Sequence, residues 1–340
     1  MKYLLLDKTP YENGLTHGEA FKEDIHLCAN VRLDLLKGYL EELTWDQIQI
    51  LANKEIEVLK KSPLEYEEFS GIAKGANISE VLLAVLNNYT DMRNFSESTL
   101  GCSALYYKSD STSISGQTWD MTPEALPYVL HLEIKGEPSL HILTITGCLA
   151  LSGFSSLGVS AFMNDLKTTE TSIGLMWPAL MRKILRAPTA QQGHELLTQN
   201  LPSSGHHYLI SDKYQAYSIE TTGKQYEVVQ NLGSNGYSIH TNHYKGRLGG
   251  TVADSSLSAS TKLRDEAMDN YFKASNDLTF DNIAQNVFAK ELGSGGVAML
   301  PSGDSPAAIT CGGMMYDHLA NNGIIYNNHY SKENIKKIGF

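Results

Sequence analysis

The chain has 340 residues, of which 42% are hydrophobic and 19% are charged, as is typical of a globular protein with a large buried core. Its 38 acidic and 27 basic residues give a net charge of −11, without any cluster of Lys and Arg. This charge argues against nucleic acid and an anionic membrane surface as partners. No window approaches the roughly 18 consecutive apolar residues that a membrane-spanning helix needs.

The N-terminal residues and the cysteines predict the compartment. The apolar run at residues 3–6 is too short for the core of a signal peptide. The cysteines are widely spaced and form neither a Cys-x-x-Cys pair nor a His/Cys metal pattern; they are Cys28, Cys102, Cys148 and Cys311. We therefore expect a reduced, cytoplasmic protein that uses no metal and no other cofactor.

The first hundred residues predict one strand, at residues 3–6, and then mainly helices. Apolar residues recur every three or four positions up to about residue 40, and Gly14 and Gly18 lie at the start of that helix. Thr44 is predicted to cap the next helix, which ends before Pro63. Further helical stretches are expected at about 64–75 and 79–92.

After Gly101 the pattern changes to short runs rich in β-branched and aromatic residues, separated by turn residues, which predict strands. Helices are expected among these strands at about 178–199, 256–274 and 279–290. This order predicts helical layers over stacked antiparallel sheets, an α+β fold. The sequence contains no repeat and no linker, so we expect a single domain over residues 1–340.

The segment GCSALYYKSDSTSISGQTWD holds the strongest candidate for chemistry. A strand is predicted to begin at Cys102, a turn at about residues 108–113 reverses the chain, and the second strand ends at Asp120. Such a hairpin brings a carboxylate back close to the cysteine. As alternatives, Cys102 is a core residue and Asp120 a turn residue at the end of a strand. Cys148 shares the Gly-Cys dipeptide, but its neighbours are apolar and predict a core residue.

Other motifs have simpler explanations. The glycine-rich segments GRLGGT and GSGGVAML match neither dinucleotide-binding nor phosphate-binding patterns and are predicted to be loops. His206 and His207 would face opposite sides of a strand, as would Asn242 and His243, so neither pair is expected to bind a metal ion.

An ordered series of segments resembles the acyl-coenzyme A:isopenicillin N acyltransferase family, whose members are cysteine N-terminal-nucleophile (Ntn) hydrolases. The segments span nearly the whole chain, and they are NGLTHGEAFKEDI, LNNYTDMRNF, GCSALYY with GQTWD, GFSSLGVSAFMND, HHYLISDKYQAYSIET, HTNHY and SSLSASTKLRDEA. The more distant bile-salt and penicillin-V amidases share the Cys…Asp pattern but lack the long helical leader. This chain departs from the family at Ser103, where Thr is frequent. In LPSGDSPAAITCGG, it has no clear counterpart of a late arginine.

The resemblance implies a four-layer αββα sandwich and a chain that cleaves itself. The thiol of Cys102 would attack the carbonyl of Gly101, which a residue without a Cβ leaves open to close approach. Cleavage would give residues 1–101 and 102–340, and the smaller piece would stay bound through the apolar faces of its helices.

The resemblance also implies roles at the site. The new α-amino group of Cys102 would be the base for its own thiol, held in place by Asp120. Asn242 would donate to the oxyanion. The alternative is a turn asparagine at the end of a strand. Three further residues match supporting positions of the family: Arg93, Glu220 and His243.

The implied activity is a cofactor-independent acyltransferase or amidase that acts on a small amide or acyl thioester through an acyl-Cys102 intermediate. The alternatives are a hydrolase of β-alanyl or carcinine-type N-acyl amines, and a family member that never matures and only binds a ligand or partner. Tyr106, Trp119 and Phe154 are candidates for the substrate pocket, and the alternative is that they pack between the sheets. A homo-oligomer is compatible with the sequence.

Overall fold

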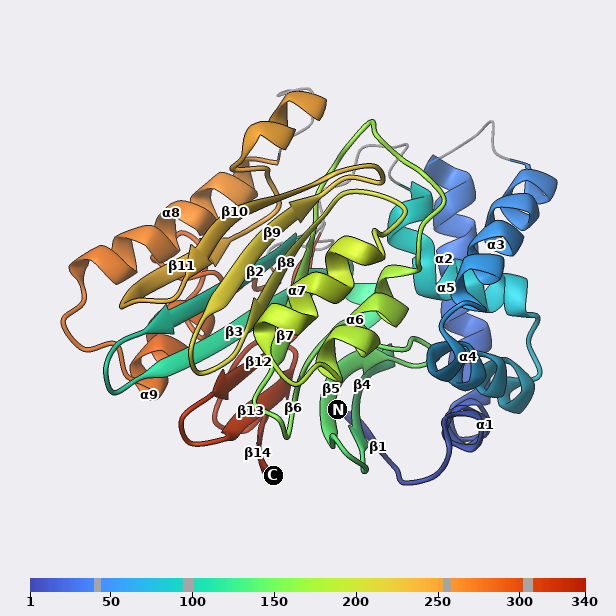
Figure 1. The fold of residues 1–340 in the computed structure, drawn as a ribbon, viewed down its shortest axis with the longest axis horizontal. Coiled ribbons are helices and arrows are strands. Elements are labelled where there is room, and N and C mark those ends of the chain that lie inside the picture. Colours follow the sequence, from blue (N-terminus) through green and yellow to red (C-terminus); the bar gives the residue numbers. More distant parts are fainter. Residues whose placement is uncertain (40–43, 94–100, 253–257, 302–307) are drawn as a thin grey trace.

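The computed structural model describes residues 1–39, 44–93, 101–252, 258–301 and 308–340. A strand and a group of helices precede the predicted nucleophile, and they are β1 (Lys2–Leu6), α1 (Pro10–Ala20), α2 (Lys22–Tyr39), α3 (Trp45–Leu59), α4 (Pro63–Ala76) and α5 (Glu80–Arg93). In Figure 1 these helices lie together on the right of the molecule. Thr44 caps α3 and forms a capping box with Gln47, as its position in the sequence predicts.

The first sheet has the strand order β1-β4-β5-β6-β7-β8-β9-β10 within the described residues. Its strands after β1 are β4 (Val129–Ile134), β5 (Leu140–Ile145), β6 (Ser152–Ser155), β7 (Ser160–Asp165), β8 (His206–Ser211), β9 (Ala216–Thr221) and β10 (Tyr226–Leu232). β1 pairs in parallel with β4, and the other neighbours are antiparallel. The chain thus forms the antiparallel meander that the sequence predicts.

The second sheet has the order β11-β2-β3-β12-β13-β14 in the part of the chain that is described. Its strands are β2 (Gly101–Lys108), β3 (Ser113–Met121), β11 (Gly236–His240), β12 (Ile309–Asp317), β13 (Asn322–Asn327) and β14 (Ile335–Gly339). Each pair of neighbours in this sheet is antiparallel. The predicted nucleophile therefore begins a central strand, not an edge strand.

The two sheets pack face to face and helices cover both outer faces, so the predicted αββα sandwich is confirmed (Figure 1). The remaining helical segments are η1 (Pro123–Tyr128), α6 (Trp177–Leu185), α7 (Ala190–Gln199), η2 (Arg247–Thr251), α8 (Ala259–Ala274), α9 (Phe280–Ile283) and the π-turn η4 (Ala284–Phe288). α6 and α7 pack on the first sheet, while α8 packs on β2 and β11 of the second. Apolar residues between the sheets continue into the N-terminal helices as one core.

Alternation along β2 decides which way the nucleophile points. Successive side chains of a strand face opposite sides of its sheet. Cys102, Ala104 and Tyr106 belong to the core between the sheets, whereas Leu105 belongs to the separate apolar cluster under α8. The Cys102 side chain is therefore directed into the sandwich, and its neighbour Ser103 toward α8.

Helices α1 and α4 approach closely through glycines. Gly14 and Gly18 lie inside α1, opposite Gly71 and Gly75 of α4. A Cβ at Gly14 would lie 2.0 Å from the Glu68 carbonyl oxygen, so only glycine permits this contact between backbones. The prediction that Gly14 and Gly18 begin a helix running to about residue 40 is thus wrong. Both glycines lie inside α1 and allow it to pack on α4, and the helix is interrupted between α1 and α2.

Several predicted bounds differ from the structure. The helix expected at 279–290 is the short α9 followed by the π-turn η4. The predicted helix ends near residues 40 and 256 lie outside the described residues, as do residues 302–307 of the segment searched for a late arginine.

Within the described ranges, no single helix has the length and apolar character to cross a membrane, and only α4 and α5 together, bent by 119°, meet those two criteria.

Candidate active site

Three adjacent strands position Cys102. In the β2–β3 hairpin, Cys102 lies opposite Trp119 and Gly101 lies opposite Asp120, which is the pairing that the predicted turn requires. On the other side, β11 pairs with β2 so that His240 lies opposite Ala104. The chain leaving β11 therefore reaches Cys102 two residues later, at Asn242.

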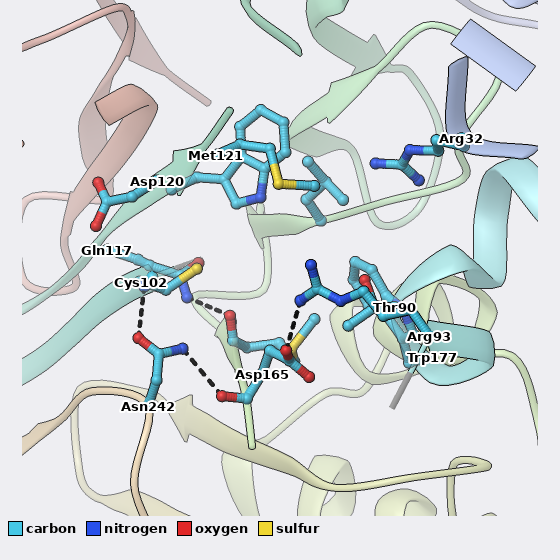
Figure 2. Close-up of a pocket in the computed structure, with 14 residues that line it drawn as sticks. Arg32, Thr90, Arg93, Cys102, Gln117, Asp120, Met121, Asp165, Trp177 and Asn242 are labelled. Atoms are coloured by element: carbon cyan, nitrogen blue, oxygen red, sulfur yellow. Dashed lines mark hydrogen bonds and ion pairs between the residues drawn. The ribbon is translucent and has the colours of Figure 1, made fainter. Parts of the chain in front are cut away.

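Asn242 binds the backbone of Cys102 directly. The Cys102 N–H donates to Asn242 Oδ1 over 2.8 Å, and Asn242 Nδ2 donates to the Asp165 carbonyl oxygen over 2.9 Å (Figure 2). Arg264 Nη2 also donates to Asn242 Oδ1, over 3.0 Å. Two donors on one side and a carbonyl on the other fix the orientation of this amide. The predicted oxyanion donor thus holds the backbone nitrogen of Cys102.

Arg264 belongs to the segment SSLSASTKLRDEA that resembles the family, but it was not among the candidate site residues. Its guanidinium donates to the Cys102 carbonyl oxygen over 2.5 Å and to Ser103 Oγ over 2.9 Å, in addition to Asn242. The buried stripe of α8 consists of Thr261, Arg264, Met268 and Phe272. A fully buried arginine on the apolar stripe of a helix is uncommon without a partner, and this was the signal that could have found it.

Asp120 returns close to Cys102, as the hairpin predicts, but its carboxylate lies on the α8 side of the sheet. Its Oδ1 accepts from Thr310 Oγ1 over 2.7 Å, and its Oδ2 lies 4.0 Å from Arg264 Nη1. Figure 2 shows its carboxylate directed away from the Cys102 sulfur. Burial raises the pKa of Asp120 to about 6, with Arg264 and Thr310 opposing the rise. Asp120 acts on the site through Arg264, and Asn242 holds the Cys102 nitrogen.

The Cys102 side chain faces a small cavity of about 30 Å³ between the ends of the two sheets. Burial is the main factor that raises the pKa of the Cys102 thiol, and the carboxylate of Asp120 adds to it, so the thiol is protonated at neutral pH. The apolar part of the wall consists of Trp119, Met121, Leu151, Met163 and Trp177. Of the aromatic residues predicted to line a substrate pocket, Trp119 is the one that does so.

Charged side chains form the opposite wall of this cavity. Arg93, at the end of α5, donates to Asp165 Oδ2 over 2.7 Å, and Arg32 of α2 lines the same cavity. In Figure 2 both guanidinium groups lie across the cavity from Cys102. Arg93 therefore lies at the site, as its sequence position predicts, and it acts through the residue whose carbonyl orients Asn242.

Glu220 and His243 lie behind the site and do not line the cavity. Glu220 lies 2.9 Å from His240 Nε2 and accepts from the Gly246 N–H over 3.0 Å, so it fixes the loop that carries Asn242. His243 Nδ1 lies 3.1 Å from Thr261 Oγ1, and burial lowers its pKa to about 4. The His243 ring is consequently neutral at neutral pH and positions the loop.

The prediction that Tyr106 and Phe154 line the substrate pocket is wrong for this cavity. Tyr106 is fully buried two residues beyond Ala104, and its hydroxyl donates to the Asp212 carbonyl oxygen. Phe154 stacks on Tyr316 with ring centroids 4.4 Å apart. Both serve packing between the sheets, which was the alternative explanation. Among the described residues, no group of three His, Cys, Asp or Glu side chains is arranged to hold a metal ion.

Gly101 is required by the close approach of Arg264. A Cβ at this position would lie 2.7 Å from Arg264 Nη2 and 3.3 Å from Asp120 Oδ2. We expect Gly101→Ala to displace the guanidinium, to lower the free energy of unfolding by about 1–3 kcal/mol and to slow cleavage at this bond. Chemical denaturation and a time course on denaturing gels measure the two effects.

The matched control is Gly38→Ala, because a Cβ at this position in α2 meets nothing within 4 Å. We expect this variant to unfold at the wild-type denaturant concentration or slightly above it, since alanine favours a helix. If Gly101→Ala is as stable and as rapidly cut as Gly38→Ala, the contact with Arg264 does not require glycine at position 101.

Comparisons with known proteins found a similar acyltransferase. No family model matches the chain. The chain is 27% identical over 248 residues to the acyl-coenzyme A:6-aminopenicillanic-acid-acyltransferase 40 kDa form of Emericella nidulans, which covers 72% of this chain and 69% of that protein.

Two solved structures are also similar. A variant of conjugated bile acid hydrolase from Clostridium perfringens has a TM-score of 0.49 at 12% identity, covering 70% of this chain and 92% of that one. Penicillin V acylase from Agrobacterium tumefaciens has a TM-score of 0.40 at 11% identity, covering 70% and 86%. The match to the acyltransferase confirms the resemblance that the ordered motifs predict, and the chain is similar to the penicillin acyltransferase-like family of cysteine Ntn hydrolases.

Proposed function

We propose that the protein is a self-processing cysteine Ntn hydrolase that transfers or hydrolyses acyl groups through an acyl-Cys102 intermediate. The observation that carries the proposal is the position of Cys102. Its thiol faces a cavity, its N–H is bound to Asn242 Oδ1 at 2.8 Å, and its carbonyl is bound to Arg264. A core cysteine requires none of these contacts. The similarity to an acyltransferase supports an enzyme of acyl-transfer or amide-hydrolysing type.

The proposed processing begins within the hairpin. The Cys102 sulfur adds to the carbonyl carbon of Gly101, and the C–N bond breaks as the leaving nitrogen gains the proton that the thiol loses. The product is a thioester between Gly101 and the Cys102 sulfur, next to a free α-amino group. Water then hydrolyses the thioester, which leaves a carboxylate on Gly101 and a free thiol on Cys102.

Cleavage gives the nucleophile its own base. An α-amino group has an ordinary pKa near 8 and a cysteine thiol near 8.5, so proton exchange between them is feasible at neutral pH. Asn242 Oδ1, which accepts from the Cys102 N–H before cleavage, would accept from the amine afterwards. Asn242 Nδ2 carries two hydrogens, of which one donates to Asp165, and the second would serve the oxyanion of the substrate.

The proposed turnover uses the same thiol on a substrate. The thiolate attacks an amide or thioester carbonyl, the amine or thiol leaves with the proton, and an acyl-Cys102 thioester remains. Attack by water completes hydrolysis, and attack by another amine completes acyl transfer. A hydrolase of carcinine-type amides follows the same steps with another leaving amine, and a family member that never matures stops before them.

An acyl-enzyme adduct tests this proposal. We expect the piece 102–340, incubated with acyl-coenzyme A thioesters or N-acyl amides, to gain the mass of one acyl group, which iodoacetamide pretreatment of Cys102 prevents. Mass spectrometry of the intact pieces measures the gain, and a parallel screen measures product release. Cut protein that forms no adduct and turns over no acyl donor would contradict the proposed activity.

A further inference from the structure

We propose that the substrate carries a carboxylate and that Arg32 binds it. The inference rests on the proposed function, because it names the class of substrate that the Cys102 site takes. The amide or thioester would place its reactive carbonyl at Cys102 and its carboxylate at the opposite wall of the cavity.

Arg32 is a buried cation that faces the cavity. Only 5% of its surface is exposed, and it lines the same cavity as Cys102. Its Nη1 donates to the Leu86 carbonyl oxygen, and its guanidinium carbon lies 5.3 Å from the centre of the Tyr89 ring. Figure 2 shows the guanidinium directed from α2 toward the interior of the cavity.

The other deeply buried arginines have carboxylate partners. Arg93 pairs with Asp165, Arg182 with Glu68, and Arg264 lies 4.0 Å from Asp120. Within the described residues, Arg32 forms an ion pair with none of the carboxylates. Burying a cation without a counter-charge is costly, and such costs are retained where a ligand supplies the missing charge.

The charges around the cavity leave an excess positive charge at this wall. Arg32 and Arg93 both pack against the Tyr89 ring, the second with its guanidinium carbon 5.4 Å from the ring centre. Asp165 neutralises Arg93, while Asp120 is turned away toward Arg264. A substrate carboxylate at Arg32 would neutralise the excess positive charge of this wall. The planar guanidinium suits a carboxylate because it offers parallel N–H donors.

The cavity of about 30 Å³ is smaller than such a substrate, so the proposal requires it to widen when the substrate enters. Met121, Leu151 and Met163 would contact an apolar body between the carboxylate and the reactive carbonyl. Arg32 and Arg93 both belong to residues 1–101. The proposal therefore assigns substrate recognition to the piece that cleavage separates, and gives that piece a reason to stay bound.

Matched substrate pairs test this inference. The cut wild-type protein is assayed with two pairs of substrates. Hexanoyl-glycine, compared with hexanoyl-glycinamide, carries the carboxylate on the leaving amine. Glutaryl-anilide, compared with its carboxamide, carries the carboxylate on the acyl group. The expected result is a kcat/KM ratio of about tenfold to hundredfold in favour of the carboxylate in one pair, because a charged hydrogen bond contributes that much.

Three variants assign the preference to a residue. Arg32→Gln should bring the ratio close to one, mainly through KM, and Arg32→Lys should retain part of it. Arg247→Gln is the control, because this arginine is 66% exposed and should leave the ratio unchanged. Thermal unfolding of each variant establishes that it is folded.

A binding measurement keeps the inference separate from the proposed activity. Calorimetric titration of hexanoyl-glycine and hexanoyl-glycinamide should show the same carboxylate preference, and its loss in Arg32→Gln, whether or not the protein turns either compound over. No preference in kinetics or binding, or a preference that survives Arg32→Gln, would overturn the assignment. Absence of cleavage and turnover, with the binding preference intact, would contradict the proposed function alone.

Discussion

A Cys102→Ala protein is expected to remain one uncut chain without acyl-transfer or amidase activity. Alanine removes the sulfur that would attack the Gly101 carbonyl while leaving the Cys102 N–H bond to Asn242 and the carbonyl bond to Arg264 in place. Denaturing gels after prolonged incubation measure cleavage, and acyl-donor assays measure turnover. Losing the nucleophile should reduce both to background.

The matched control is Cys148→Ala. Cys148 follows a glycine as Cys102 does, but it is fully buried in the common core and contacts the Ala150 carbonyl oxygen. This variant should be cut at the wild-type position, with a modest loss of stability from the small void. If Cys102→Ala still splits between residues 101 and 102, the self-processing account is wrong.

Replacing Asn242 by alanine is expected to reduce turnover by a factor of about 10²–10³ with a much smaller change in KM. The change removes the acceptor for the Cys102 nitrogen, the acceptor for Arg264 and the donor to Asp165. The amine would lose its fixed position beside the thiol, and an oxyanion would lose a donor. Steady-state kinetics of the cut fraction measure kcat and KM separately.

Asn235→Ala is the control for this prediction. The Asn235 side chain is exposed and donates to Asp110 over 2.9 Å, in the turn that leads into β11. It should be processed and should turn over substrate at wild-type rates. An Asn242→Ala protein with unchanged kcat would remove Asn242 from the site.

The nucleophile hairpin was predictable because it is local. Turn residues between two alternating runs fix its register, and the register alone pairs Cys102 with Trp119 and Gly101 with Asp120. The sequence pattern did not predict the surroundings of the Asp120 carboxylate. Asp120 is paired with Gly101 and faces the α8 side of the sheet, where Arg264 attracts it. The local pattern predicted that Asp120 lies close to Cys102, and the packing of α8 determined which residues Asp120 contacts.

Contacts between distant segments were beyond the sequence pattern. The pairing of β11 with β2 brings Asn242 to Cys102, and nothing in either strand specifies that partner. The resemblance to a known family selected Asn242 and Arg93 as candidates. Neither the family motifs nor periodicity singled out Arg32, whose importance depends on the carboxylates around it.

The glycines of α1 are another case in which contacts between distant segments could not be predicted. The pattern of α1 reads as an interrupted start because Gly14 and Gly18 disfavour a helix. In the fold they allow α1 to touch α4 at the backbone, and this contact compensates for their low propensity. The weak strand β6, with the sequence SGFS, is likewise stabilised by its neighbours β5 and β7.

The N-terminus of the mature protein tests the account most directly. We expect mass spectrometry and N-terminal sequencing of freshly purified, folded wild-type protein to find two associated polypeptides, one ending at Gly101 and one beginning with a free Cys102. Folded protein that keeps the bond between Gly101 and Cys102 after incubation near neutral pH would contradict it. So would a new terminus at any other residue.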